Sequence, residues 1–333
     1  RCIIVDAYFD TTAHSQGIYA SKVDGLLVEE CVIDHNGWKG DVAGTGPTIF
    51  NHNIYVQGDC GPATIRRNII SAASSHGCQL RPGGMLSDNL FIGNPLAAFV
   101  AADINPVVST MENNVVYLGR DIDPANQRGS GLEVHALATT GAIVRGNIIS
   151  QREATGYNGT ALAIANKGAV VTDNIIYNWS EPAFALTNNN SSTWSGMRFE
   201  RNTVWLGAGT SGGFLAIGSA EAQMNPGAIR FSGNRYFSAG PTSAWFRIGG
   251  SNASLAAWNT TTGDSGVNTA TVPGWSDPSR NIASYNLTLG GSADTRAFLT
   301  AARSQRRSSW DRRLTAIAVN EYVREGFGVS GGR

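Results

Sequence analysis

The sequence predicts an all-β fold, a right-handed parallel β-helix solenoid followed by a C-terminal helical tail. Three observations lead to this prediction. Short runs of β-forming residues recur along most of the 333 residues, an asparagine stands at a fixed place in most runs, and only the last part has helical spacing. The 40 glycines and the 15% of charged residues are typical of tight turns and short strands.

The repeat consists of two or three polar residues, an asparagine and two β-forming residues. It places asparagines at the following positions: Asn68, Asn89, Asn114, Asn147, Asn174, Asn202 and Asn234. Cys2 and Cys31 stand at the same place in two earlier units, and Asn286 gives a late match. Most intervals are 21 to 37 residues, enough for one turn of a coil that stacks on the next. Asparagine suits this corner because its short amide tolerates a left-handed backbone and can bond to the asparagine of the next coil.

This pattern resembles the asparagine ladder of the pectate-lyase superfamily, which includes polysaccharide lyases and glycoside hydrolases. The resemblance covers roughly residues 1–290, which we expect to form one solenoid of about ten coils. It indicates the fold and says little about the reaction, because the catalytic motifs of that superfamily cannot be carried over residue by residue. A β-sandwich or a propeller would need several strands in each unit, whereas each unit here supplies one turn.

Residues 291–333 form the predicted helical cap. Apolar residues recur there at intervals near three and four: Phe298, Leu299, Leu314, Ile317 and Tyr322. We expect this tail to pack against the solenoid and to shield its open end or its side. Its run of arginines is interpreted as a solvated helix face, since 25 basic and 25 acidic residues leave the chain without net charge.

A second strand column precedes the asparagine corner, and its outward side chains are predicted to form a polar face. With Phe99 and its equivalents pointing inward, alternation gives two outward rows. The first row is Tyr19, Tyr55, Gln79, Val100, Glu133, Ala163 and Ala185. The second row is Ser21, Gln57, Arg81, Ala102, His135, Ala165 and Thr187. Polar and aromatic residues gather on the first five coils, which span about 20 to 25 Å, enough for several sugar rings.

The chemistry of this face favours β-elimination from an acidic polysaccharide. His52, Tyr55, His76 and Arg81 are predicted to share one patch on neighbouring coils. An imidazole or phenolate can accept a proton, a second such group can donate one, and a guanidinium can neutralise a uronate carboxylate. A simpler interpretation is that the histidines stabilise turns and that Arg81 braces the glycine turn after it.

Further residues are predicted to bind the substrate. Tyr19, Gln57 and Gln79 lie in the two outward rows. The variable segments 34–51, 119–130 and 151–159 should wall a groove over the polar face and bring other side chains to it. The substrate-binding candidates in these segments and beside the face are Trp38, Lys39, Asp103 and Arg128. Trp38 could stack on a sugar ring, although a loop tryptophan is as often packed down against the solenoid.

Three other functions remain open. Glu133 with Asp103 or a loop aspartate would give the carboxylate pair of a glycoside hydrolase. A uronate C5-epimerase would share the proton abstraction, and a non-catalytic solenoid could bind glycans through aromatic platforms alone. Glu133, His135 and a third ligand could hold a metal, yet no HxH or HExxH spacing supports one. We therefore expect no metal or other cofactor, with calcium as the alternative.

The charge balance also limits the partners. A neutral chain is not expected to bind nucleic acid or an anionic membrane surface as its main partner. No run of 18 uncharged apolar residues could span a membrane. The sequence opens on a strand-like run without an initiator methionine or a signal peptide, so we expect an upstream segment to have been removed. The oligomeric state is left open.

The four cysteines are compatible with an oxidising compartment, and we expect a secreted or periplasmic protein. Cys2 and Cys31 share one column of successive coils, within disulfide reach in principle. Cys60 and Cys78 could form a second pair, and a buried stack of thiols is the alternative.

Overall fold

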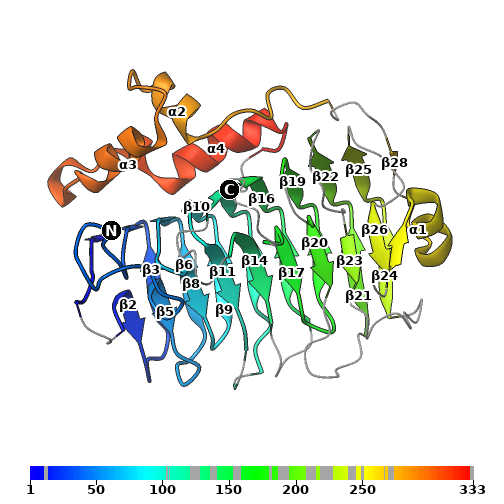
Figure 1. Cartoon of the computed structure of the whole chain (residues 1–333), viewed down its shortest axis with the longest axis horizontal. Coiled ribbons are helices and arrows are strands. Elements are labelled where there is room, and N and C mark those ends of the chain that lie inside the picture. Colours follow the sequence, from blue (N-terminus) through cyan, green and yellow to red (C-terminus); the bar gives the residue numbers. More distant parts are fainter. Residues whose placement is uncertain are drawn as a thin grey trace.

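Stacked parallel strands form a β-helix, and three helices lie along one of its sides (Figure 1). The computed structural model describes the chain except for residues 11–13, 103, 105, 121–127, 136–140, 153–158, 180–181, 187–194, 208–214, 218–227, 239–244, 249–250, 266, 269–273 and 331–333.

Within the described residues, three sheets make up the solenoid. Sheet A has ten strands: β1 (Ile3–Val5), β4 (Val32–Asp34), β7 (Ile69–Ser71), β10 (Leu90–Ile92), β13 (Val115–Gly119), β16 (Ile148–Arg152), β19 (Ile175–Tyr177), β22 (Thr203–Leu206), β25 (Arg235–Ser238) and β28 (Val267–Asn268). Sheet B also has ten: β2 (Gln16–Ala20), β5 (His52–Val56), β8 (His76–Leu80), β11 (Leu96–Val100), β14 (Ser130–Val134), β17 (Leu162–Ile164), β20 (Phe184–Leu186), β23 (Leu215–Ile217), β26 (Phe246–Ile248) and β27 (Ser251–Ala253). Sheet C has eight: β3 (Leu27–Glu29), β6 (Ala63–Arg66), β9 (Gly84–Ser87), β12 (Thr110–Glu112), β15 (Ile143–Arg145), β18 (Val170–Thr172), β21 (Met197–Glu200) and β24 (Ile229–Ser232).

The predicted solenoid is confirmed. The residue that follows each repeat asparagine also forms the surface on which the C-terminal helical tail packs. Ile69 pairs with Leu90, and Leu90 pairs with Val115, so one apolar row runs along the outside of sheet A. The next residue in each strand, such as Ile70, points into the solenoid core. The outer row belongs to a second core that includes Phe298 from the helical tail. Sheet A is therefore buried on both faces, which accounts for the paired β-formers of the repeat.

The predicted asparagine ladder is present. Each side-chain amide donates to the side-chain oxygen of the next asparagine at 2.9 to 3.1 Å, and this chain is unbroken from Asn68 to Asn234. Each side-chain oxygen also accepts from the backbone N–H of the preceding ladder residue, which includes Cys31 at 2.9 Å. The ladder ends on the Asp264 carboxylate, 3.3 Å from Asn234 Nδ2. All these buried polar groups are thereby paired.

Two details of the predicted ladder are wrong. The left-handed backbone belongs to the residue before each asparagine, for example Arg67 (φ 59°) and Asp88 (φ 56°), so the amide serves for hydrogen bonding only. Asn286 lies outside the ladder, in helix α2, where its side-chain nitrogen donates to Ser292 O at 2.8 Å.

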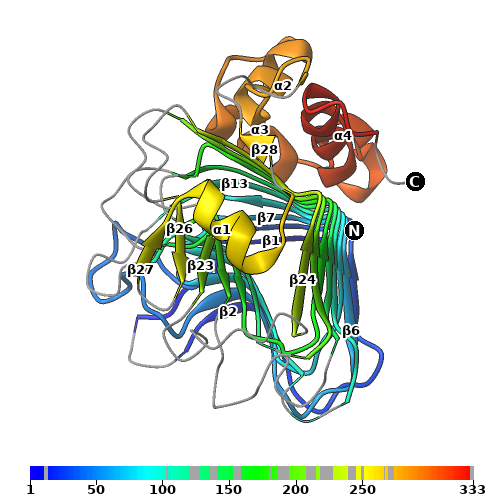
Figure 2. The same cartoon turned by 90° about the vertical axis from the view of Figure 1, so that its right-hand side faces the viewer.

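Helices close one end and cover one side of the solenoid. They are α1 (Leu255–Thr262), α2 (Ile282–Thr288), α3 (Thr295–Arg303), the 3-10 turns η4 (Arg307–Ser309) and η5 (Arg312–Leu314), and α4 (Ala316–Gly326). The view along the solenoid shows α1 across its C-terminal end, and α2, α3 and α4 outside sheet A (Figure 2). The helical part thus begins before residue 290, because α1 and α2 occupy segments expected to form coils. The predicted packing of the tail against the side is confirmed.

No disulfide joins the four cysteines. Cys2 is exposed, and Cys31, Cys60 and Cys78 are buried. Cys2 and Cys31 do share one column, since their following residues pair as Ile3 with Val32. Burial raises the pKa of the Cys78 thiol to about 12, which keeps it protonated. Among the helices of the described residues, none is long and apolar enough to cross a membrane.

Candidate functional site

Strand pairing in sheet B fixes the outward rows on the polar face. Tyr19 pairs with Tyr55, and Tyr55 pairs with Gln79. Gln79 then pairs with Phe99, and Phe99 with Glu133. The predicted row therefore holds except in β11, where the outward residue is Phe99 and Val100 is fully buried. The second row changes at the same strand. Val100 pairs with Leu80, so the residue beside Arg81 is Ala101 and not the predicted Ala102.

The alternation of side chains is interrupted at the start of β5 and β8, which brings two histidines onto the same face. Asn53 leaves the alternation and is buried at the corner, where its side-chain oxygen lies 2.8 Å from Asn36 Nδ2. In the next coil this position is Gly77, and an added Cβ there would lie 2.6 Å from Ala97 O. Because of this interruption, His52 lies on the side of Tyr55, with ring centroids 5.2 Å apart.

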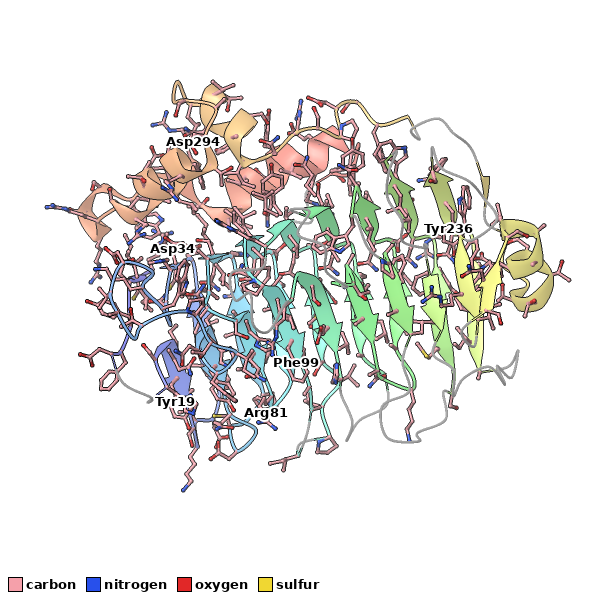
Figure 3. The ribbon with its side chains drawn as sticks, viewed as in Figure 1. Tyr19, Asp34, Arg81, Phe99, Tyr236 and Asp294 are labelled. Atoms are coloured by element: carbon pink, nitrogen blue, oxygen red, sulfur yellow. The ribbon has the colours of Figure 1, made fainter. Side chains whose placement is uncertain are left out.

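These side chains line a groove of about 730 Å³ on the first three coils. Its walls are His14, Gln16, Tyr19, Ile49, Phe50, His52, Tyr55, Gln57, His76, Gln79, Arg81 and Arg128. Figure 3 shows Tyr19, Arg81 and Phe99 on the same part of the solenoid, away from Asp34 and Asp294 beside the helical tail. Within the described part of the chain, the groove lining contains two arginines and no carboxylate, so its charge favours an anionic ligand.

His52 and His76 form a buried, uncharged pair. Their Nδ1 atoms lie 3.2 Å apart, and the backbone N–H of His76 donates to His52 Nδ1 at 3.2 Å. Burial lowers the pKa of His52 to about 3, and the nearby charge of Arg128 adds to this effect. Burial also lowers the pKa of His76 well below its ordinary value, with His52 as the next cause. Both imidazoles therefore stay neutral near pH 7 and act through hydrogen bonds.

Arg81 and the tyrosines form the more open side of the groove. Arg81 Nη1 donates to Tyr55 Oη at 3.3 Å. The Tyr55 ring meets the Tyr19 ring edge to face, with centroids 5.7 Å apart, and 56% of Tyr19 is exposed. A guanidinium beside a phenolic oxygen stabilises negative charge on that oxygen and on an incoming carboxylate.

Glu133 and His135 lie farther along the face, beyond Phe99. His135 Nε2 is 3.7 Å from Glu133 Oε2, and the His135 ring packs 4.8 Å from the Phe99 ring. Burial raises the pKa of Glu133, although a hydrogen bond to Ser130 and the charge of Arg128 oppose the rise. These two residues adjoin the groove without lining it.

Two predicted substrate-binding residues lie elsewhere. Trp38 Nε1 donates to Ala72 O at 2.9 Å, so its ring is packed down against a corner. Lys39 Nζ lies 5.1 Å over the Tyr8 ring and 3.9 Å from Asp41. Neither residue lines the groove, because strand alternation does not determine the path of a loop. Asp103 falls outside the described residues.

The groove also contains residues that the sequence reasoning missed. His14 and Phe50 pack against each other at 5.4 Å, and both line the groove with Gln16. Gln16 Oε1 accepts from the backbone N–H of His52 at 2.6 Å. Gln16 pairs with His52 across neighbouring strands. Applying the row argument to the first residue of each strand, as well as to the later ones, would have placed Gln16 beside His52.

In the part of the chain described, no group of three or more His, Cys, Asp or Glu side chains is arranged to hold a metal ion. Comparisons of the chain with protein-family models, with curated proteins and with solved structures found no match.

Proposed function

We propose that this protein binds an acidic polysaccharide in the groove and cleaves it by β-elimination. The observation that carries this proposal is the groove lining, which joins Arg81 and Arg128 to aromatic rings, amides and neutral imidazoles, without a carboxylate among its described residues. Tyrosines suit the apolar face of a sugar ring, and arginine suits a planar carboxylate through a bidentate fork.

Tyr55 and Arg81 would perform the reaction. Arg81 would bind the uronate carboxylate and so stabilise the negative charge that develops when the neighbouring C5 proton leaves. The Tyr55 oxygen, held by the same guanidinium at 3.3 Å, would accept that proton. The C5–H electron pair becomes the C4–C5 double bond, the C4–O bond breaks, and the departing oxygen takes the proton from Tyr55. His52 and His76 suit hydrogen-bond roles better than that of the base, since burial lowers the pKa of each.

A hydrolase is the second candidate, and the raised pKa of Glu133 favours it, because a general acid must hold its proton near neutral pH. Glu133 would need a second carboxylate at a suitable distance. We also propose that the chain is a distant relative of the pectate-lyase superfamily and acts outside the cytoplasm. The asparagine ladder supports the first of these two proposals.

The test is incubation with pectate, alginate, glycosaminoglycans and acidic bacterial exopolysaccharides, followed by ultraviolet absorbance of the unsaturated product and by a reducing-end assay. We expect absorbance to rise, and Tyr55→Phe and Arg81→Ala each to abolish the rise. Arg247→Ala is the matched control, because Arg247 is an exposed arginine of sheet B on a distant coil, in the outward row that contains Tyr55.

The other outcomes separate the alternatives. New reducing ends without absorbance, lost in Glu133→Gln, would replace elimination by hydrolysis. Exchange of solvent deuterium into uncleaved polymer would indicate epimerisation. Binding without any of these changes would indicate a non-catalytic solenoid.

A further inference from the structure

A chain of hydrogen bonds ties Arg128 to the histidine pair. Arg128 Nη1 donates to Ser75 Oγ at 2.6 Å, and Ser75 Oγ lies 3.1 Å from His76 Nδ1. His76 Nδ1 is in turn 3.2 Å from His52 Nδ1. Ser75 is 1% exposed, so its hydroxyl is a fixed, buried acceptor at the edge of β8. Arg128 comes from a separate segment just before β14, and Ser75 anchors it at this edge.

The donors and acceptors in this series of hydrogen bonds can be assigned, and Arg128 is its charged member. His52 Nδ1 accepts from the backbone N–H of His76, so the proton of the neutral His52 ring lies on Nε2. His76 Nδ1 then carries a proton, which faces both His52 Nδ1 and Ser75 Oγ. Ser75 Oγ accepts from Arg128 as well, so neutral side chains support this guanidinium on one side, and the Glu133 carboxyl lies within its electrostatic reach.

Arg81 and this anchored arginine mark opposite ends of the same strand. Ser75 and His76 stand at the start of β8, and Arg81 follows its last residue. Arg81 is five residue steps along the strand from His76, which places their backbones about 16 Å apart. Tyr55 and Gln79 lie between these ends and line the same groove.

We propose that Arg128 is a second anion-binding residue and that Ser75 is the positioning residue that holds it. The groove then selects a glycan with acidic groups on at least two sugars, one group near each end of β8. A glycan with one acidic sugar among neutral ones would occupy only one of the two arginines. This inference rests on the proposed function for the glycan nature of the ligand, and it does not depend on cleavage.

Titration calorimetry with saturated tetrasaccharides from pectate and alginate tests it. Each is compared with a counterpart in which all carboxylates but one are methyl-esterified. We expect Arg128→Ala to weaken binding of the fully acidic form about ten-fold or more and to weaken its salt dependence. The affinity for the form with one free carboxylate should fall much less in the same variant. Ser75→Ala should give part of the same loss, and Ser75→Thr, which keeps the hydroxyl, should restore it.

Arg247→Ala is again the control for charge, and circular dichroism checks that each variant is folded. Equal affinity of wild type and Arg128→Ala for the fully acidic form would overturn the inference, as would equal losses for both forms, or no binding of either oligosaccharide. If the protein cleaves the polymer but Arg128→Ala weakens binding of both oligosaccharides equally, the proposed function stands and the two-anion inference fails. If Arg128→Ala selectively weakens binding of the fully acidic form but no cleavage occurs, the two-anion inference stands and the proposed cleavage fails.

Discussion

The buried histidine pair should make the stability of the protein depend on pH in a defined direction. In the folded chain the pKa of His52 is about 3, against 6.5 for an exposed imidazole. A lowered pKa means that the unfolded chain binds the proton first, so the stabilisation is complete above about pH 6.5 and is lost as the pH falls toward about 3. His76 acts in the same direction. Four carboxyl groups with raised pKa values act in the opposite direction: Asp34, Asp88, Glu133 and Asp264.

The size of the effect follows from the two pKa values of His52. A separation of 3.5 units corresponds to at most about 5 kcal/mol, and the part lost between about pH 7.5 and about pH 5 is about 2 kcal/mol. Urea unfolding of wild type and His52→Gln across this range measures that part together with the effect of His52 on the pKa of His76, while the carboxyl groups contribute to both proteins. We expect a flatter pH profile for His52→Gln than for wild type. Identical slopes for wild type and His52→Gln would refute the reasoning.

Three further predictions concern the solenoid and its tail. Asn114→Ala removes the partners of Asn89 and Asn147 inside the ladder, and we expect about 3 kcal/mol of lost stability in urea unfolding. Asp264→Ala leaves three buried donors, on Asn234, Tyr236 and Trp258, without their acceptor, so the Tm should fall by several degrees, and less in Asp264→Asn. Arg303→Ala removes the cation that bridges Asp6 and buried Asp34, so amide hydrogen exchange in α3 should rise while that in α1 stays unchanged.

The fold could be predicted because its repeat is local. Each asparagine and the two β-formers after it satisfy the same corner in every coil, so the pattern appears directly in the sequence. The packing of the tail could also be predicted from the sequence. The first of the two β-formers after each asparagine faces away from the solenoid core and, being apolar, needs a partner there. Asn286 misled because a single local match carries no information about where the coils end and the helices begin.

The candidate site was less accessible for two physical reasons. Strand β11, Leu96–Val100, is apolar throughout, so alternation gave no sign of which residues face outward, and Phe99 was placed on the wrong side. Loop residues have no period at all, and Trp38 and Lys39 therefore could not be placed by counting. The positions of His52 and His76 were predictable only as neighbours, because the residues after them, Asn53 and Gly77, interrupt the alternation through contacts with other coils.

The most direct test of the central claim is equilibrium binding of a polyuronate and of its fully methyl-esterified form to wild type, Arg81→Ala and Arg247→Ala. An anion-binding groove on the first three coils predicts tight binding of the acidic polymer by wild type and Arg247→Ala. It also predicts at least about ten-fold weaker binding by Arg81→Ala and little binding of the ester by any of the three. Equal binding of acid and ester, or equal binding by all three proteins, would contradict it.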